Sequence, residues 1–343
     1  MSLARAIETG DLAELPSRRD EDWHWTDLRG LLREMPPAPK PFAGALPEAR
    51  LAAYIETAVV NGDRPALIRI APGEAQSAAL RIVAAGEPSS HVAQATIEVG
   101  AGGRLTLFET YESVVDGAVT EADLDIRLGE GARLERIVLA DGGAETVLVS
   151  RAEVTLAPGA RLAQTTLTAG GRRLRLETLV VHPGRGAAAR LDGVYLLADQ
   201  RHADITTVVD HIGPGGSTDQ LTKGVVRDQA RGVFQGRIVV RPGADQTDAR
   251  MGHHALILSE RAEVDAKPEL EIFADDVACA HGNTVGALDE DALFYAEQRG
   301  IPEAEAKAML TEAFVGEVVD RIEHEGARDV IRAWVAERLR GAA

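Results

Sequence analysis

The chain has 343 residues and a formal net charge of −17. This excess of acid argues against nucleic acid and anionic membrane surfaces as partners, because binding to either depends on clustered lysine and arginine. One cysteine excludes an internal disulfide framework and fits a reducing compartment, so we expect a cytoplasmic protein. No stretch of the sequence approaches the roughly 18 consecutive apolar residues of a membrane-spanning helix.

The N-terminal region is rich in charge, and residues 2–34 are predicted to be helical. A proline-rich stretch, 36–48, follows and predicts a linker or an extended crossing, because proline removes hydrogen-bond donors and fixes φ. Within the first segment, Trp23 and Trp25 flank His24. Two indoles so close together favour a segment that docks on a surface and covers a hydrophobic edge. A ligand role for His24 is the alternative.

From about residue 55 to residue 285, short alternating runs are broken by glycine, and no helical period interrupts them. A glycine-containing turn followed by Arg-Leu recurs at spacings of 29, 28 and 29 residues, at Arg104, Arg133, Arg161 and Arg190. A strand–turn–strand unit that repeats at such a period is typical of a solenoid. The sequence therefore predicts a β-helix, with a β-sandwich as the alternative, and the arginines are interpreted as solvated turn residues.

A helical period replaces the alternation from Asp289 onward. Acidic residues at its start and Arg299-Gly300 at its end bound a first helix, and Pro302 marks the start of a second. A third helix carries an apolar stripe over residues 327–339. We expect this helical part to cap an open end of the β-helix, because exposed strand edges invite unwanted pairing.

The only cysteine, Cys279, lies two residues before His281, in a segment that reads as the end of a strand followed by glycine-containing turns. Side chains two residues apart on an extended chain point to the same side. Thiolate and imidazole both suit zinc or iron. Because a closed metal or cluster site needs about four ligands, the pair is half a site. Either it is structural, or it works with ligands from another protein.

Signals for enzyme chemistry are weak. The stretch 213–218 lacks the Lys-Ser/Thr ending of a phosphate loop. The adjacent residues His253 and His254 would face opposite ways on a strand, and so would Asp275 and Asp276. We therefore expect no catalytic residues and no enzyme. A carbohydrate-active β-helix enzyme is the alternative, and it would require a carboxylate pair in a groove on one face of the solenoid.

Several short motifs occur together in the second half of the chain: Asp204–His211, Gly232–Val240, Gln246–Asp248, Leu256–Ser259, Pro268–Ile272, Cys279–Gly282, Leu293–Tyr295 and Arg299–Ile301. With them, residues 191–314 resemble the SufB/SufD family of iron–sulfur cluster assembly proteins, and its SufD branch in particular. Pro16–Leu28 resembles the N-terminal helical motif of the family.

The resemblance implies a mainly β protein with a right-handed parallel β-helix over 51–287. An α-helical N-terminal region with its proline-rich linker, 1–50, and a C-terminal helical domain, 288–343, would flank it. The resemblance further implies a non-catalytic subunit that pairs with a SufB-like protein through the β-helix. The C-terminal helices would hold a SufC-like ATPase, with partner-binding positions at Phe294, Tyr295, Arg299 and Phe314.

The functional histidine of the family lies in a Cys-Ser-His-Gly context, which assigns that role to His281. Cys279 is the weaker candidate, since packing as a small apolar side chain explains it about as well. His281 would share metal with a thiolate of the SufB-like partner in a transient iron–sulfur cluster, and none would stay bound to the chain alone. A homodimer in isolation, or a SufB-like homodimeric scaffold, is the remaining alternative. Asn283 stands where the family usually has alanine.

Overall fold

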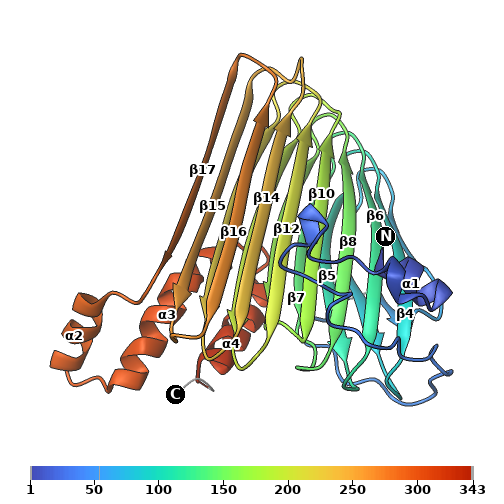
Figure 1. The fold of residues 1–343 in the computed structure, drawn as a ribbon. Helices are drawn as coiled ribbons and strands as arrows, with labels where there is room; N and C mark the ends of the chain where they lie inside the picture. The colour runs from blue at the N-terminus through green and yellow to red at the C-terminus, as the bar shows by residue number, and fades with distance from the viewer. Residues whose placement is uncertain (1, 54, 341–343) are drawn as a thin grey trace.

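The computed structural model of the chain describes residues 2–53 and 55–340. Within them, strands and short turns wind into a parallel solenoid of about 8 turns, bounded by two sheets (Figure 1). The odd-numbered strands form a nine-stranded sheet, sheet A, and the even-numbered strands form an eight-stranded sheet, sheet B. Neighbouring strands in each sheet pair in parallel. This arrangement confirms the predicted parallel β-helix and excludes a β-sandwich, whose sheets are antiparallel.

The elements have the following bounds. Sheet A consists of β1 (Ile55–Val60), β3 (Ala75–Ala84), β5 (Arg104–Ser113), β7 (Arg133–Ala140), β9 (Arg161–Thr168), β11 (Ala188–Leu197), β13 (Ser217–Val226), β15 (Thr247–Ile257) and β17 (Val277–Gly286). Sheet B consists of β2 (Ala66–Ile70), β4 (Ser90–Val99), β6 (Val119–Leu128), β8 (Val147–Leu156), β10 (Arg173–His182), β12 (His202–His211), β14 (Arg231–Val240) and β16 (Glu263–Ile272). The helices are α1 (Leu3–Thr9), α2 (Glu290–Gln298), α3 (Glu303–Val319) and α4 (Glu325–Arg340), with 3₁₀ turns η1 (Leu12–Glu14) and η2 (Glu21–Trp23).

Stacked turns explain the repeat in the sequence. Gly131 and Gly159 have φ of +63° and +67°, a left-handed conformation that glycine adopts without the strain a Cβ would bring. The N–H of Gly131 donates to the carbonyl of Pro158 at 2.9 Å, and the N–H of Gly159 donates to the carbonyl of Arg185 at 3.0 Å. Each turn therefore hydrogen-bonds to the turn of the next coil, so the coils must keep similar lengths.

The strand register shows that one of the four arginines of the predicted repeat, Arg190, is not in line with the other three. Arg104, Arg133 and Arg161 lie side by side in neighbouring strands of sheet A, and all three are exposed. The residue beside Arg161 is Ala188, so Arg190 is two residues out of step. Arg190 is half-buried and forms ion pairs with one carboxylate of its own strand and one of the helical region. Its interpretation as a solvated turn residue is therefore wrong.

A charged pair lies inside the otherwise largely apolar solenoid. Arg136 donates two hydrogen bonds to Glu109, at 2.8 and 2.6 Å, and neither side chain is more than 2% exposed. Gln164 accepts a further bond from Arg136 at 2.7 Å, and Tyr111 donates to Glu109 at 2.6 Å. The two buried charges compensate each other, which is the condition under which ions are tolerated in a core.

The C-terminal helices occur where the sequence predicted them, but the expected end cap is wrong. α3 and α4 pack against the outer face of sheet A, where Val318 and Trp334 join an apolar cluster with Ile137 and Val194 (Figure 1). The indole N–H of Trp334 donates to Asp141 at 2.9 Å. The outward apolar side chains of sheet A form the surface on which α3 and α4 bury their own apolar residues. The last strand of each sheet is therefore left without a covering helix.

None of the helices in the part of the chain that the structure describes is both long enough and apolar enough to cross a membrane.

The N-terminal segment departs from its predicted helix. Over the described residues from 2 to 34, only Leu3–Thr9 is α-helical, and the remainder is 3₁₀ turns and irregular chain. Trp23 is half-buried and lies beneath the Arg175 guanidinium, 4.6 Å from the ring centroid. It also packs beside the apolar cluster under α1. The indole thus covers the face of sheet B and not an edge, and these contacts outweigh the local helical tendency.

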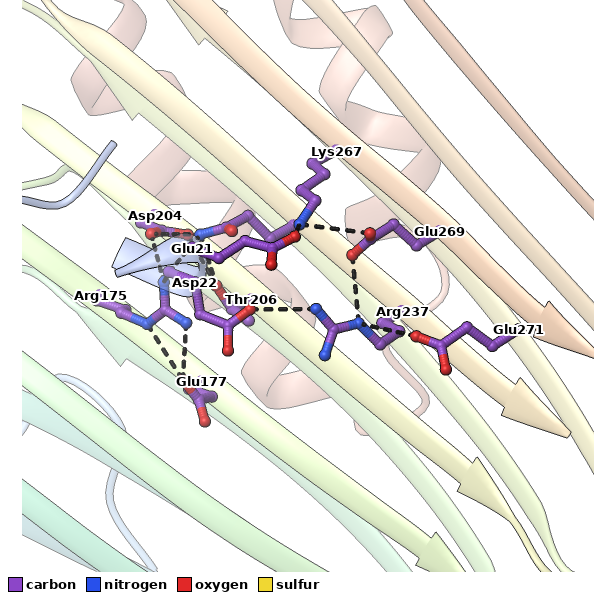
Figure 2. A network of polar contacts seen from close by, with 11 residues as sticks. Glu21, Asp22, Arg175, Glu177, Asp204, Thr206, Arg237, Lys267, Glu269 and Glu271 are labelled. Carbon is purple, nitrogen blue, oxygen red and sulfur yellow. Dashed lines mark hydrogen bonds and ion pairs between the residues drawn. The ribbon is translucent and has the colours of Figure 1, made fainter. Parts of the chain in front are cut away.

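A polar network fastens this segment to the outer face of sheet B (Figure 2). Asp204 is fully buried and accepts hydrogen bonds from Thr26 at 2.6 Å and from Arg175 at 2.8 Å. Arg175 also donates to the carbonyl of Asp22 at 2.7 Å. At the edge of the network, Lys267 pairs with Glu21 at 2.9 Å. Arg175 therefore both neutralises Asp204 and holds the segment in place.

Replacement of Arg136 by methionine is expected to lower the free energy of unfolding by about 3–5 kcal/mol, because it leaves Glu109 buried without a counter-ion. The double variant Arg136→Met/Glu109→Met is expected to recover part of that loss, since it removes both charges. Urea unfolding of the isolated chain measures the two values. A double variant no more stable than Arg136→Met would contradict the assignment of a compensated core pair.

Replacement of Arg175 by methionine is expected to release the N-terminal segment, because Asp204 loses its counter-ion and Asp22 loses a donor. Trypsin should then cleave after the exposed residues Arg18 and Arg19 at least about tenfold faster, since cleavage follows the population of the opened form. Arg69→Met is the matched control, because Arg69 forms an exposed pair on the same sheet. Equal cleavage rates in both variants would refute the role of Arg175.

Candidate functional site at the open end of the solenoid

Both sheets end in unpaired strands at the same end of the solenoid, which we call the open end. β16 is the last strand of sheet B and β17 is the last strand of sheet A (Figure 1). β16 contains Pro268, a residue that sheets accept only at an edge or a bulge. Three large apolar side chains are exposed here: Ile272, Phe273 and Val285. The open end therefore combines unpaired backbone groups with apolar surface.

The Cys279–His281 pair lies on β17 and not at the end of the preceding strand. The predicted turn at Asp275-Asp276 separates β16 from β17, whereas Gly282 lies within β17 and has no positive φ. In the register with β15, Cys279 pairs with Ala249 and His281 pairs with Met251. Ala249 and Met251 are buried in the solenoid core, so Cys279 and His281 also point inward, where no further coil covers them.

The two side chains differ in access. Cys279 is half-buried and packs against the core, and burial raises the pKa of its thiol. A protonated, packed thiol is a poor ligand, because the thiolate is the form that binds metal. His281 is exposed. Within residues 2–53 and 55–340, no three His, Cys, Asp or Glu side chains are grouped as a metal site.

Two histidines of the preceding strand in sheet A, His253 and His254, contact residues of β17 close to His281. His253 is fully buried, and burial lowers its pKa to about 4, so it is neutral at pH 7. Its Nδ1 lies 2.7 Å from Oδ1 of Asn283, the residue two places beyond His281. His254 lies on the other face of the strand, with its Nδ1 2.7 Å from the hydroxyl of Thr284. The opposite orientation of the adjacent histidines is as predicted.

The contact between His253 and Asn283 was missed by sequence reasoning. The two residues lie 30 positions apart, close to the period of the repeat, and this spacing is the signal that could have found it.

The other predicted residues lie elsewhere. His24 is exposed on the N-terminal segment, with its Nδ1 3.2 Å from the carbonyl of Arg18, and it is not brought to Cys279. On α2, Phe294 and Tyr295 are exposed, at 61% and 60%. Arg299 lies over the ring of Tyr295, 4.9 Å from its centroid.

The fourth position predicted to bind a partner, Phe314, is half-buried against sheet A. Lys223 lies 4.5 Å from its ring centroid. Packing within the chain thus accounts for part of the Phe314 side chain, and its role in binding a partner stays a prediction.

Acidic residues line one groove on the outer face of sheet B, the kind of feature that the carbohydrate-active alternative requires. Asp123, Asp125 and Glu153 border this groove of about 510 Å³. Arg127 pairs with Asp125, and Arg151 pairs with Glu153 at 2.8 Å. Burial raises the pKa of Asp123. Two of the three carboxylates are neutralised by neighbouring arginines, which favours a surface ion-pair network over an acid–base pair.

The fold is that of a parallel β-helix protein, and Cys279 and His281 lie on the last strand of sheet A at its open end. Residues 81–314 match the family model described as SUF system FeS cluster assembly, SufBD core domain. The chain belongs to this family.

Individual relatives agree with the family match. The chain is 31% identical over 303 residues to the iron–sulfur cluster assembly protein SufD of Escherichia coli (strain K12), covering 87% of this chain and 70% of that protein. It is 27% identical over 366 residues to an iron–sulfur cluster assembly SufBD family protein of Mycobacterium bovis, covering 96% and 90%. It is also 32% identical over 137 residues to SufD of Bacillus subtilis (strain 168), covering 40% and 31%.

Proposed function

We propose that this chain is a non-catalytic scaffold subunit of a SufBCD-type complex for iron–sulfur cluster biogenesis. It pairs with a SufB-like protein through the open end of the β-helix and with a SufC-like ATPase through its C-terminal helices. His281 contributes to the nascent cluster at the interface with the SufB-like protein. The observation that carries the proposal is the exposure of His281 on an unpaired strand, at the end where both sheets stop.

The number of ligands supports a site shared between subunits. An iron–sulfur cluster takes about four protein ligands, and this chain has one cysteine. The thiol of Cys279 is half-buried with a raised pKa, which leaves His281 as the accessible ligand. The cluster is therefore cargo, held transiently with thiolates of the SufB-like partner and not bound stably by the isolated chain.

The unpaired edges support strand pairing between subunits. The N–H and C=O groups on the outer sides of β16 and β17 can bond to a second β-helix, which would continue both sheets across the interface. Phe273 at 58% exposure, with Ile272 and Val285, would add apolar contact to this pairing. In the absence of the partner, a homodimer would use the same edges, and the native mass of the chain alone measures that state.

α2 supports a second binding surface. It contributes no buried residue, and in Figure 1 it lies at the lower left, beyond the foot of β17 and beside α3. Phe294 and Tyr295 together offer a large apolar area there, with Arg299 stacked on Tyr295. Exposed aromatic residues with an adjacent arginine are typical of binding hot spots. A bound ATPase could shift the two β-helices as it cycles, and so change access to His281.

His281→Ala is expected to fold and to form the complex, because the side chain is exposed, but to lower the yield of assembled cluster at least about tenfold. Reconstitution with the SufB-like and SufC-like partners, iron and a sulfur source, followed by visible absorbance, measures that yield. His24→Ala is the control and tests the alternative ligand directly, with an unchanged yield expected. A normal yield with His281→Ala would remove His281 from the mechanism.

The double variant Phe294→Ala/Tyr295→Ala is expected to weaken binding of the SufC-like ATPase by about 30-fold, the equivalent of about 2 kcal/mol for loss of hot-spot residues. Isothermal titration with the purified ATPase measures the affinity. Leu67→Ala is the matched control, because Leu67 is 56% exposed on β2 at the opposite end of sheet B. Equal affinities for both variants would place the ATPase surface elsewhere.

A further inference from the structure

A line of hydrogen-bonded side chains runs inside the solenoid and emerges at the open end beside His281. The hydroxyl of Tyr195 on β11 lies 2.9 Å from Nε2 of His253 on β15. Nδ1 of His253 lies 2.7 Å from Oδ1 of Asn283 on β17. Tyr195 and His253 are both 0% exposed, whereas Asn283 is exposed. The interior of the solenoid is therefore connected to one surface amide.

Glycines make room for this line. Tyr195 is in register with Gly224 of β13, and a Cβ at Gly224 would lie 1.9 Å from Cζ of the tyrosine ring. A Cβ at Gly232 of β14 would lie 2.4 Å from Cε2 of the same ring. The tyrosine therefore crosses the position that a side chain of β13 would fill, and it reaches His253 two strands away in sheet A. Any larger residue at Gly224 would break the line.

His253 is held in one plane. Its ring stacks on Phe234 with 4.8 Å between centroids and an angle of 2° between the planes. A neutral imidazole has one N–H and one acceptor nitrogen. Oδ1 of Asn283 can only accept, so Nδ1 of His253 carries the N–H and donates to it. Nε2 is then the acceptor nitrogen, and the buried hydroxyl of Tyr195 donates to it at 2.9 Å. One tautomer of His253 therefore satisfies both neighbours, and it holds the amide in this orientation.

The orientation of Asn283 leaves its amino group as a donor at the open end. Its oxygen accepts the hydrogen bond from His253, and within the part of the chain that the structure describes no group accepts a hydrogen bond from its NH₂ group. Asn283 lies two residues beyond His281 on the same strand, so the two side chains share the inward face of β17. An imidazole that can bind metal and an amide that can donate to an anion therefore stand next to each other.

We propose that Asn283 donates a hydrogen bond to an anionic sulfur, a thiolate or sulfide, of the cargo that His281 binds, and that Tyr195 and His253 are positioning residues for this donor. The inference rests on the proposed function of His281. Anionic sulfur is the class of acceptor that fits, because soft metals at such a site arrive with thiolate or sulfide ligands. Hydrogen bonds to these sulfurs tune the electronics of the metal and the affinity for it.

The test compares variants of the full chain in the complex reconstituted with its partners, Fe²⁺ and sulfide. Asn283→Ala is expected to lower the rate of cluster formation about tenfold. It should also shift the sulfur-to-iron absorption bands to longer wavelength, because a sulfur without its donor is more electron-rich. Asn283→Asp, of equal size, replaces the donor by a negative charge and should lower the rate further. Tyr195→Phe should shift the bands in the same direction as Asn283→Ala but less, although it changes no surface atom.

Thr284→Val is the matched control, since it removes a similar histidine contact on the opposite face of β17. It should leave both the rate and the bands unchanged, and thermal unfolding of the isolated chains checks that each variant folds. Wild-type rate and spectrum in Asn283→Ala, with loss of clusters in His281→Ala, would overturn this inference alone. Altered bands in Asn283→Ala with a normal His281→Ala would overturn the role of His281 and keep the contact of Asn283. No change in either variant would overturn both.

Discussion

A coil of this solenoid can bury its apolar side chains only against the coils on either side of it. The last coil, formed by β16 and β17, has a neighbour on one side only. His281 on β17 is therefore exposed, whereas Met251 at the matching position of β15 is 2% exposed. The candidate site exists because the solenoid ends at β17, so that no further coil covers His281. It needs no inserted loop, and the rigidity of the strands fixes where the imidazole lies.

The chain outside the solenoid covers the faces of the sheets and leaves this end uncovered. The N-terminal segment is fastened to sheet B through Asp204, and the C-terminal helices pack on sheet A around Trp334. Soluble proteins usually protect strand edges with charge, bulges or a covering element. Here both extensions lie on the faces of the sheets, and Phe273 and Val285 are exposed beside the unpaired edge. On the proposed function, this edge is the surface that the second subunit covers.

The sequence predicted the parts of the molecule that follow from local periodicity: the coils, the C-terminal helices and the shared face of Cys279 and His281. It did not predict the N-terminal segment, because Thr26 is positioned by Asp204, 178 residues away. It did not predict where the helices pack either, since that depends on outward side chains from many coils. Asn283 is an intermediate case. Its partner His253 lies 30 positions earlier, which is about one coil. An alignment of the sequence by the repeat period would therefore have placed the two residues side by side.

A ligand set divided between two chains couples cargo binding to subunit pairing. On the proposed function, docking of the partner both continues the two sheets and adds the thiolates that His281 lacks. By thermodynamic linkage, the factor by which docking raises the affinity for iron and sulfide equals the factor by which iron and sulfide tighten docking. An exposed imidazole with a fixed donor beside it suits such a system, because little side-chain ordering remains to oppose binding. The isolated chain then holds the geometry of half a site without the affinity to retain the metal.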